Sequence, residues 1–237
     1  MTGFRKNEDD ERTERSDERS SYTAVVRDRV FVGLWTLNFL FVAAGYSLLN
    51  LVPAFARDHA HISEREIGVM FFVNTLLIVI VQLPISRAIE GRRRMRALAL
   101  MPALWVVAWL LVDAGGYWFD ATAAFVVFTV ALGIFGIGEC FHGPAHQALV
   151  AEIAPGHLRG RYFAVHSLSW GLAGTVGPAV GGFLLAVAPF ALWPVAAFVC
   201  LGAALGALAL EARVPERYRR IPRVEPELPV LDGTAVV

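Results

Sequence analysis

The chain has 237 residues, of which 56% are hydrophobic and only 18% charged, and its mean hydropathy is positive at +0.54. This composition excludes an ordinary soluble domain and indicates a membrane protein. The formal net charge is zero, so the overall balance gives no argument for a nucleic-acid partner. Lys6 is the sole lysine, and it does not follow a glycine-rich loop. The chain therefore lacks a phosphate-binding loop of the Walker type and is not its own ATPase.

The N-terminal 29 residues are dense in charge and contain no apolar core. A secretory signal peptide requires such a core, so we expect no signal peptide and a charged cytoplasmic tail over residues 1–29. A second polar tail follows the last apolar segment, over residues 212–237.

Six continuous apolar segments lie between these tails, and we predict that each one spans the membrane. At a rise of 1.5 Å per residue, each segment is long enough to cross a hydrocarbon core of about 30 Å. The connections are short, so consecutive helices should run antiparallel. The prediction is an all-α membrane protein with one six-helix transmembrane bundle over residues 30–211. The predicted spans are 30–55, 67–89, 97–119, 121–150, 162–187 and 189–210.

The distribution of basic residues predicts the orientation of the bundle. On the predicted topology, 19 of the 21 Lys and Arg residues fall on the side of the two tails, and only Arg57 and Arg65 fall on the other side. The positive-inside rule then places both termini in the cytoplasm of a multi-pass protein of the cell membrane. The basic residues in the predicted cytoplasmic loops include Arg92, Arg93, Arg94, Arg159 and Arg161.

A carboxylate within the fourth predicted span is the main candidate for a functional site. Glu139 is followed by His142 and His146, and spacings of three and seven place all three on one helix face. Such a cluster can exchange protons and couple proton movement to a conformational change. The alternative is that the three residues close a cytoplasmic gate or bond to Arg159 and Arg161.

We expect no metal site and no disulfide. His142 and His146 have one plausible third ligand, and Pro144 disturbs the helix between them. Cys140 and Cys200 fall within apolar spans, where a thiol usually behaves as a small hydrophobic group. No cofactor is expected.

Polar side chains recur on one face of the first span and on one face of the second. Asn38, Tyr46 and Asn50 are spaced in multiples of four, and Asn74 and Gln82 are eight residues apart. Such faces turn toward protein or toward a water-filled cavity, where these residues can contact a substrate. The competing interpretation is that they form hydrogen bonds between helices.

A glycine stripe marks the fifth span. Gly171, Gly174, Gly177 and Gly181 fall on one side of a helical wheel. Glycines allow helices to pack closely in a membrane, and Pro178 frees the carbonyl of Gly174, so we expect a bend here. The functional alternative is a hinge or seal that moves during transport.

The stretch GIGECFHGPAHQALVAEIAPGHLRGRYFAVHSLSWGLAGTVGPAVGG resembles the tenth and eleventh helices of a major facilitator superfamily transporter of the multidrug-efflux, drug:proton antiporter branch. The Gly138–Glu139 pair, Pro144 and the Gly177–Pro178 pair carry this resemblance. It implies a transporter that exports small molecules in exchange for protons. Its basic loop motif is degenerate here, since Ser86–Arg87 replaces the usual Asp-Arg pair, as is common in the second half of such transporters.

The same resemblance raises a question of length. Members have twelve helices in two six-helix halves with the substrate site between them, so this chain corresponds to the C-terminal half and supplies one wall of the cavity. Three explanations fit: a fragment that does not function alone, a half that pairs with a separate complementary six-helix half, or a homodimer. We favour the first two, because this surface evolved to complement a different one.

Two other function classes compete with the transporter interpretation. An intramembrane serine protease needs a serine and a histidine on different spans, but the one Gly-x-Ser motif, Gly45–Ser47, has no histidine in the final span to match it. We therefore expect no enzyme. A membrane permease subunit that works with a separate ATPase is the stronger alternative, although the short loops offer no clear docking helix.

Overall fold

The computed structural model describes residues 22–223, and these residues form helices joined by short loops. Residues 1–21 of the predicted N-terminal tail and 224–237 of the C-terminal tail lie outside the described range. The helical elements, in chain order, are α2 (Arg29–Phe41), η1 (Val42–Tyr46), α3 (Ser47–Leu49), α4 (Val52–Ala60), α5 (Glu64–Ala88), α6 (Arg94–Tyr117), α7 (Ala121–Glu139), η2 (Gly143–Gln147), α8 (Ala148–Ile153), η3 (Gly156–Leu158), α9 (Arg159–Val187), α10 (Pro189–Leu210), η4 (Glu211–Arg213) and η5 (Glu216–Tyr218).

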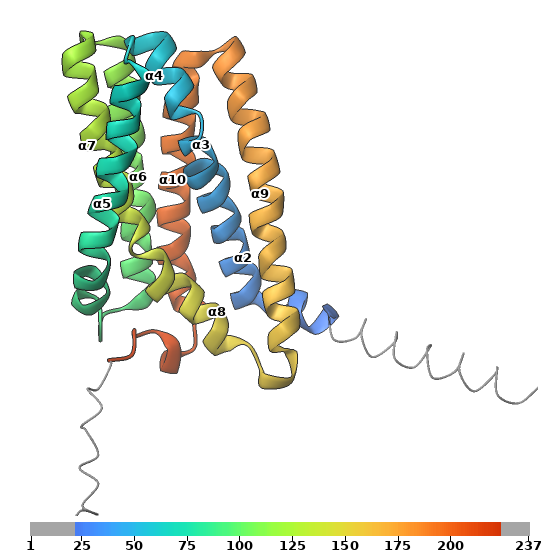
Figure 1. The fold of residues 1–237 in the computed structure, drawn as a ribbon. Helices are drawn as coiled ribbons and strands as arrows, with labels where there is room; N and C mark the ends of the chain where they lie inside the picture. The colour runs from blue at the N-terminus through green and yellow to red at the C-terminus, as the bar shows by residue number, and fades with distance from the viewer. Residues whose placement is uncertain (1–21, 224–237) are drawn as a thin grey trace, which may run out of the picture.

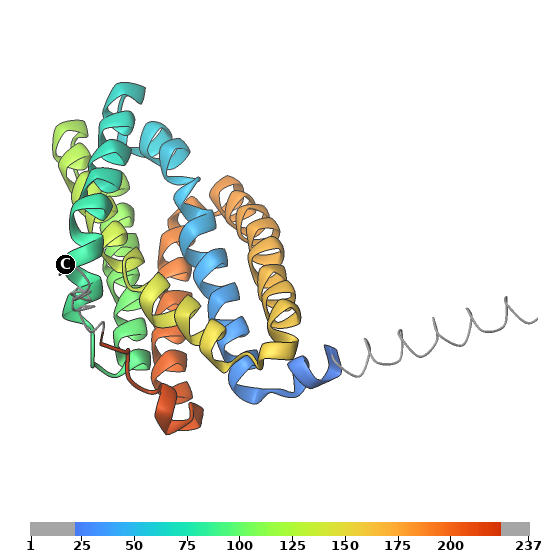
Figure 2. The same cartoon turned by 60° about the horizontal axis from the view of Figure 1, so that its bottom comes forward.

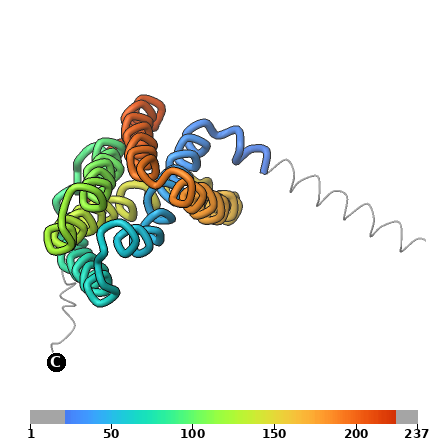
Figure 3. Tube along the Cα trace, turned by 90° about the horizontal axis from the view of Figure 1, so that it is seen from above, coloured from blue at the N-terminus to red at the C-terminus, as the bar shows by residue number. Residues whose placement is uncertain are grey.

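The long helices stand side by side in one bundle (Figure 1). α5, α6 and α7 pack together, while α10 lies between α6 on one side and α2 and α9 on the other (Figure 3). At one end of the bundle, α8 runs obliquely from the end of α7 toward α9 (Figure 2). The α5–α6 loop, the α8–α9 loop and residues 214–223 gather at this end (Figure 1). We call it the basic end, because these segments together are rich in arginine.

Six helical segments within the described range are long and apolar enough to cross a membrane, which confirms the predicted fold class of an all-α membrane protein. Local capping explains where several of them begin. The Asp28 carboxylate accepts hydrogen bonds from the second and third amides of α2, and Asp120 does the same for α7. Ser63 and Glu66 form a reciprocal capping box at the start of α5.

The first span is not the continuous helix that the sequence predicted for residues 30–55. It widens into a π-helical turn at η1, ends at Leu49 and begins again at Val52 as α4. Pro53 favours the restart, because proline has no amide hydrogen to donate and suits the first turn of a helix, where α4 places it. As a result Asn50 lies exposed in the turn and does not share the face of Asn38, which corrects the predicted alignment.

The fourth span is also interrupted where residues 121–150 were expected to form one helix. α7 ends at Glu139, a turn follows at Cys140, and the chain continues through the π-helical η2 into α8. Pro144 is the physical cause, because it cannot donate a hydrogen bond to the carbonyl of residue 140. The disturbance expected at Pro144 is therefore present, and it places Glu139 at a helix end.

The glycine stripe of α9 packs closely at two of its four positions. A Cβ atom on Gly177 would meet Ser47 Cβ at 2.6 Å, and one on Gly181 would meet Leu48 Cδ2 at 2.5 Å. A Cβ atom on Gly171 or Gly174 would meet nothing within 4 Å. Within the described residues, close packing thus belongs to Gly177 and Gly181, which lie against η1 and α3, while a packing or hinge role for Gly174 stays a prediction.

At the basic end, the C-terminal segment forms backbone hydrogen bonds with the α5–α6 loop and the start of α6. Gly91, which has a positive φ of 71°, donates its amide to the carbonyl of Ile221 (2.8 Å), and Arg94 donates its amide to Arg219 (2.7 Å). The Arg94 guanidinium is fully buried and forms two hydrogen bonds with the Glu152 carboxylate, at 2.8 and 3.0 Å. These contacts tie α6, α8 and the C-terminal segment together.

Candidate functional site

An open hollow lies where the two interrupted spans face each other. It has a volume of about 350 Å³ and is lined from five elements of the bundle. η1 supplies Tyr46, α5 supplies Gln82 and α9 supplies Trp170, while the end of α7 and η2 supply the rest. The lining residues are Tyr46, Gln82, Glu139, His142, Gly143, Gln147 and Trp170.

The carboxylate of Glu139 faces this hollow. Its side chain is half-buried, and within residues 22–223 it forms no ion pair. The predicted alternative, a bond from Glu139 to Arg159 or Arg161, does not occur in that range. A carboxylate in an apolar bundle without a basic partner is costly to keep charged, so this arrangement favours a group that takes up and releases a proton.

His142 and His146 are buried, and His142 lines the hollow together with Glu139. Their rings stack with centroids 5.1 Å apart, as expected for two residues one turn apart. Nε2 of His146 donates to the carbonyl of Leu34 at 2.9 Å, because a carbonyl oxygen only accepts. This bond ties η2 to α2.

A chain of hydrogen bonds fixes the orientation of His142. Ser169 Oγ donates to the carbonyl of His166 (2.6 Å) and accepts a hydrogen bond from Asn38 Nδ2 (2.8 Å). Oδ1 of Asn38 is then left to accept from Nε2 of His142, at 2.9 Å. The Nδ1 atom of His142 faces the amide of Gln147, 3.5 Å away. The ring is therefore held in one tautomer, with its lone pair on Nδ1 beside the hollow.

The contribution of α9 to this site was not predicted from the sequence. His166 lies with its ring centroid 5.3 Å from that of His146, and Trp170 lies 5.8 Å from His142 and 5.3 Å from Tyr46. Ser169 and Trp170 follow His166 by three and four residues, so all three lie on the same side of the helix. That spacing is the signal that could have identified them.

The predicted cavity-lining residues divide into two groups. Tyr46 and Gln82 line the hollow, and Gln82 Nε2 also donates to the carbonyl of Cys140 at 3.2 Å. Asn38 and Asn74 are buried and join helices, since Asn74 Nδ2 donates to the carbonyl of Leu132 at 2.6 Å. Hydrogen bonding between helices, the competing interpretation, therefore describes Asn38 and Asn74 best.

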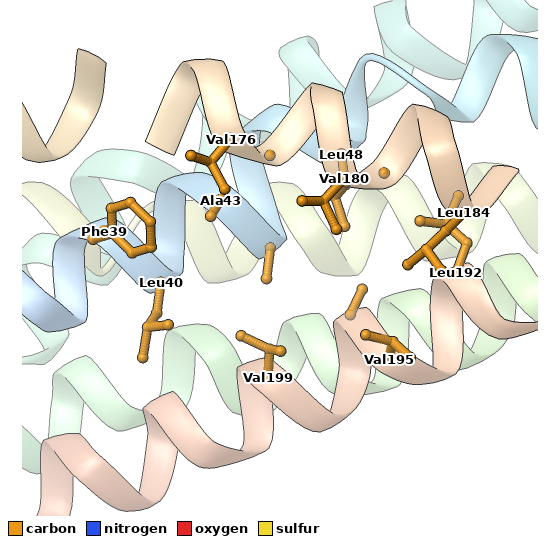
Figure 4. Close-up of a pocket in the computed structure, with 14 residues that line it drawn as sticks. Phe39, Leu40, Ala43, Leu48, Val176, Val180, Leu184, Leu192, Val195 and Val199 are labelled. Atoms are coloured by element: carbon orange, nitrogen blue, oxygen red, sulfur yellow. The ribbon is translucent and has the colours of Figure 1, made fainter. Parts of the chain in front are cut away.

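A second, wholly apolar groove runs between α9 and α10, with η1 and the end of α2 as its floor (Figure 4). Its volume is about 200 Å³, and Val176, Val180 and Leu184 on α9 face Val195 and Val199 on α10 across it. It contains no titratable group. The hollow around Glu139, in contrast, is lined by titratable side chains.

Among the described residues, no group of three or more His, Cys, Asp or Glu side chains is arranged to hold a metal ion. The two cysteines, Cys140 and Cys200, are buried and unpaired. His142 instead uses both ring nitrogens, and His146 uses Nε2, for hydrogen bonds to protein groups.

Comparisons with known proteins agree with this architecture. The family model described as "Major Facilitator Superfamily" matches residues 34–236. The chain is 26% identical over 195 residues to the multidrug resistance protein MdtH of Shigella dysenteriae, covering 80% of this chain and 46% of that protein. It is 24% identical over 174 residues to a Na(+), Li(+), K(+)/H(+) antiporter of Planococcus maritimus, covering 66% and 39%.

A third relative, described as an uncharacterized MFS-type transporter of Bacillus subtilis, is 29% identical over 79 residues, which cover 33% of this chain and 19% of that protein. The chain therefore spans less than half the length of these curated relatives. No solved structure matches it.

Proposed function

Because the chain belongs to the Major Facilitator Superfamily, we propose that it is the C-terminal six-helix half of a secondary transporter that exports small molecules in exchange for protons. The observation that carries this proposal is the hollow lined by Glu139 and His142, which is open on one side of the bundle. Two relatives are named as a multidrug resistance protein and a cation/proton antiporter, which supports the class of activity.

Glu139 is the proposed proton-binding or gating residue. An unpaired carboxylate at the wall of a transport cavity is neutral when protonated and charged when it releases the proton. Closing the cavity around the charged form costs more free energy than closing it around the neutral form. His142 and His146 position the adjoining η2 segment through their bonds to α2. Tyr46, Gln82 and Trp170 supply aromatic and amide surface for an apolar substrate.

A complementary six-helix half is the proposed partner. In the most apolar 18-residue stretch of the spans that contain α5 and α9, only 11% and 17% is buried inside the bundle. The corresponding share in the other four spans is 39–50%. α5 and α9 both contribute to the hollow, so a partner that covers these two helices would close the cavity from the opposite side. In this arrangement Gly177 and Pro178 lie in the wall that moves, as a hinge or seal.

The proposed location is the cell membrane, with the basic end in the cytoplasm. Arg57 and Arg65 lie on α4 and α5, away from the basic end, while the loops with Arg92, Arg93 and Arg159 lie at it. This asymmetry is the one that the positive-inside rule describes.

The function is tested in everted membrane vesicles that contain the chain together with its complementary half. A substrate added to energised vesicles should dissipate the pH gradient, and Glu139→Gln should abolish this proton movement while the protein stays in the membrane. Glu64→Gln, an exposed carboxylate at the opposite end of the bundle, is the matched control and should behave as wild type. Unchanged proton coupling in Glu139→Gln would remove Glu139 from the mechanism.

A further inference from the structure

A groove at the basic end combines positive charge with an apolar floor. It has a volume of about 350 Å³ and lies at the junction of the α5–α6 loop and the start of α6. We call it the arginine groove, and its lining residues are Ile89, Arg92, Arg93, Arg96, Ala97 and Leu100. The groove is separate from the hollow around Glu139, with which it shares no lining residue.

The backbone that presents these arginines is held in place. The C-terminal segment pairs with the loop through the Gly91 amide bonded to Ile221 and the Ile221 amide bonded to the carbonyl of Arg92, at 2.8 and 3.0 Å. Arg220 adds a side-chain bond to the carbonyl of Gly91 at 2.9 Å. Less conformational entropy is therefore lost when a ligand binds the three guanidinium groups than on a free loop.

Positive charge exceeds negative charge in the arginine groove. Arg93 and Arg96 share one carboxylate, that of Glu211, at 2.9 and 3.4 Å. Arg92 uses Nε to bond the carbonyl of Ala88 at 2.9 Å and has no acidic partner within residues 22–223. The side chains of Arg93 and Arg96 remain 46% and 64% exposed, so their guanidinium groups are accessible to an anion.

An apolar stripe leads away from the groove along the outside of α6. Arg96, Leu100, Ala103, Val107 and Leu110 are exposed and recur every three or four residues, so they lie on one face of the helix. Leu100, which belongs to both the groove and the stripe, is 50% exposed. An anion bound by the arginines would therefore sit at the head of a strip of surface that suits hydrocarbon.

We propose that the arginine groove binds the phosphate of an anionic glycerophospholipid, with one acyl chain along the stripe from Leu100 to Leu110. Arginine binds phosphate through paired N–H donors, and basic pockets beside membrane helices recruit anionic headgroups. The combination of charge and hydrocarbon surface commits the site to a lipid and not to a free phosphate ion. This inference is independent of the transported substrate.

The site is tested by native mass spectrometry of the purified chain with dioleoyl phosphatidylglycerol or with dioleoyl phosphatidylcholine, which share acyl chains and differ in net charge. Wild type should retain the anionic lipid in preference to the zwitterionic one. Arg92→Gln/Arg96→Gln should reduce retention of the anionic lipid by about 30-fold, since two basic residues at the surface contribute about 1 kcal/mol each. Arg57→Gln/Arg65→Gln removes the same charge at the opposite end and should retain the preference.

Three results would overturn the proposal. They are equal retention of the two lipids by wild type, an unchanged preference in the double variant, and displacement of the bound lipid by millimolar inorganic phosphate. The single variant Arg92→Gln, which gives up one bond to the Ala88 carbonyl, provides a second test if the double variant unfolds in detergent. It should retain less anionic lipid than wild type, and retention equal to wild type would count against the site.

Discussion

At the scale of single residues, buried polar side chains join the interrupted helices to their neighbours by hydrogen bonds. His142, His146 and Asn38 all use their side chains to join η2 to α2, and Arg94 joins α6 to α8 through Glu152. Each of these groups would be costly to bury without its partner. Glu139 differs from them, because within the described residues its carboxylate forms neither an ion pair nor a hydrogen bond that holds two helices together. That difference separates the structural polar residues from the candidate for proton binding.

The Arg94–Glu152 pair provides a prediction about stability. Arg94→Ala should lower the free energy of unfolding by about 3 kcal/mol, the lower end of the range for breaking a buried pair, since Glu152 keeps 32% of its side chain exposed. Arg57→Ala breaks the exposed Arg57–Asp58 pair and should cost less than about 1 kcal/mol. Unfolding of both variants in mild detergent, followed by tryptophan fluorescence, measures the difference, and equal losses would show that burial of Arg94 adds nothing.

The candidate site was predicted in part from residue spacing. Glu139 and His142 lie together in the hollow, as their spacing of three residues indicated. Asn50 was misplaced because helical periodicity assumes an uninterrupted helix, and the first span ends at Leu49. The roles of His166 and Trp170 could not be assigned, since a pattern within one helix does not reveal which other helix it faces.

At the scale of helices, continuous apolarity predicted the existence of all six membrane-spanning segments, but not their interruptions. The final span, predicted at residues 189–210, coincides with α10, whereas the first and fourth spans break near Pro53 and Pro144. A proline in an apolar run permits a kink, a π-helical turn or a restart, and packing against neighbouring helices selects among them. That selection depends on tertiary contacts that the local sequence does not contain.

Two glycines of α9 that lie three residues apart should respond differently to small substitutions. Gly177→Ala places a methyl group within 2.7 Å of Ser47 Cβ and the Ala43 carbonyl, so it should destabilise the bundle by about 1–3 kcal/mol. Gly174→Ala meets nothing within 4 Å and should be neutral or stabilising by up to about 1 kcal/mol, because alanine is the better helix former. Thermal unfolding of the two variants is the measurement. A Gly174→Ala variant as unstable as Gly177→Ala would contradict the packing described for α9.

At the scale of the whole molecule, the bundle is closed on the side of α6 and α10 and open on the side of α5 and α9. The three largest buried side chains, Trp105, Trp109 and Trp193, belong to α6 and α10 and form the closed side. The low burial of α5 and α9 leaves the hollow without an opposite wall. The shorter length of the chain relative to its relatives agrees with this picture, and a complementary half is the partner that we propose for the open side.

The most direct test of this account is the assembly state of the transport-competent protein, measured by native mass spectrometry on the detergent-solubilised sample whose activity has been assayed in vesicles. We expect the 25.9 kDa chain alone to give no proton-coupled transport, and active samples to contain it bound to a different chain of the complementary half. A stable dimer of two identical chains that carries out proton-coupled transport would contradict it.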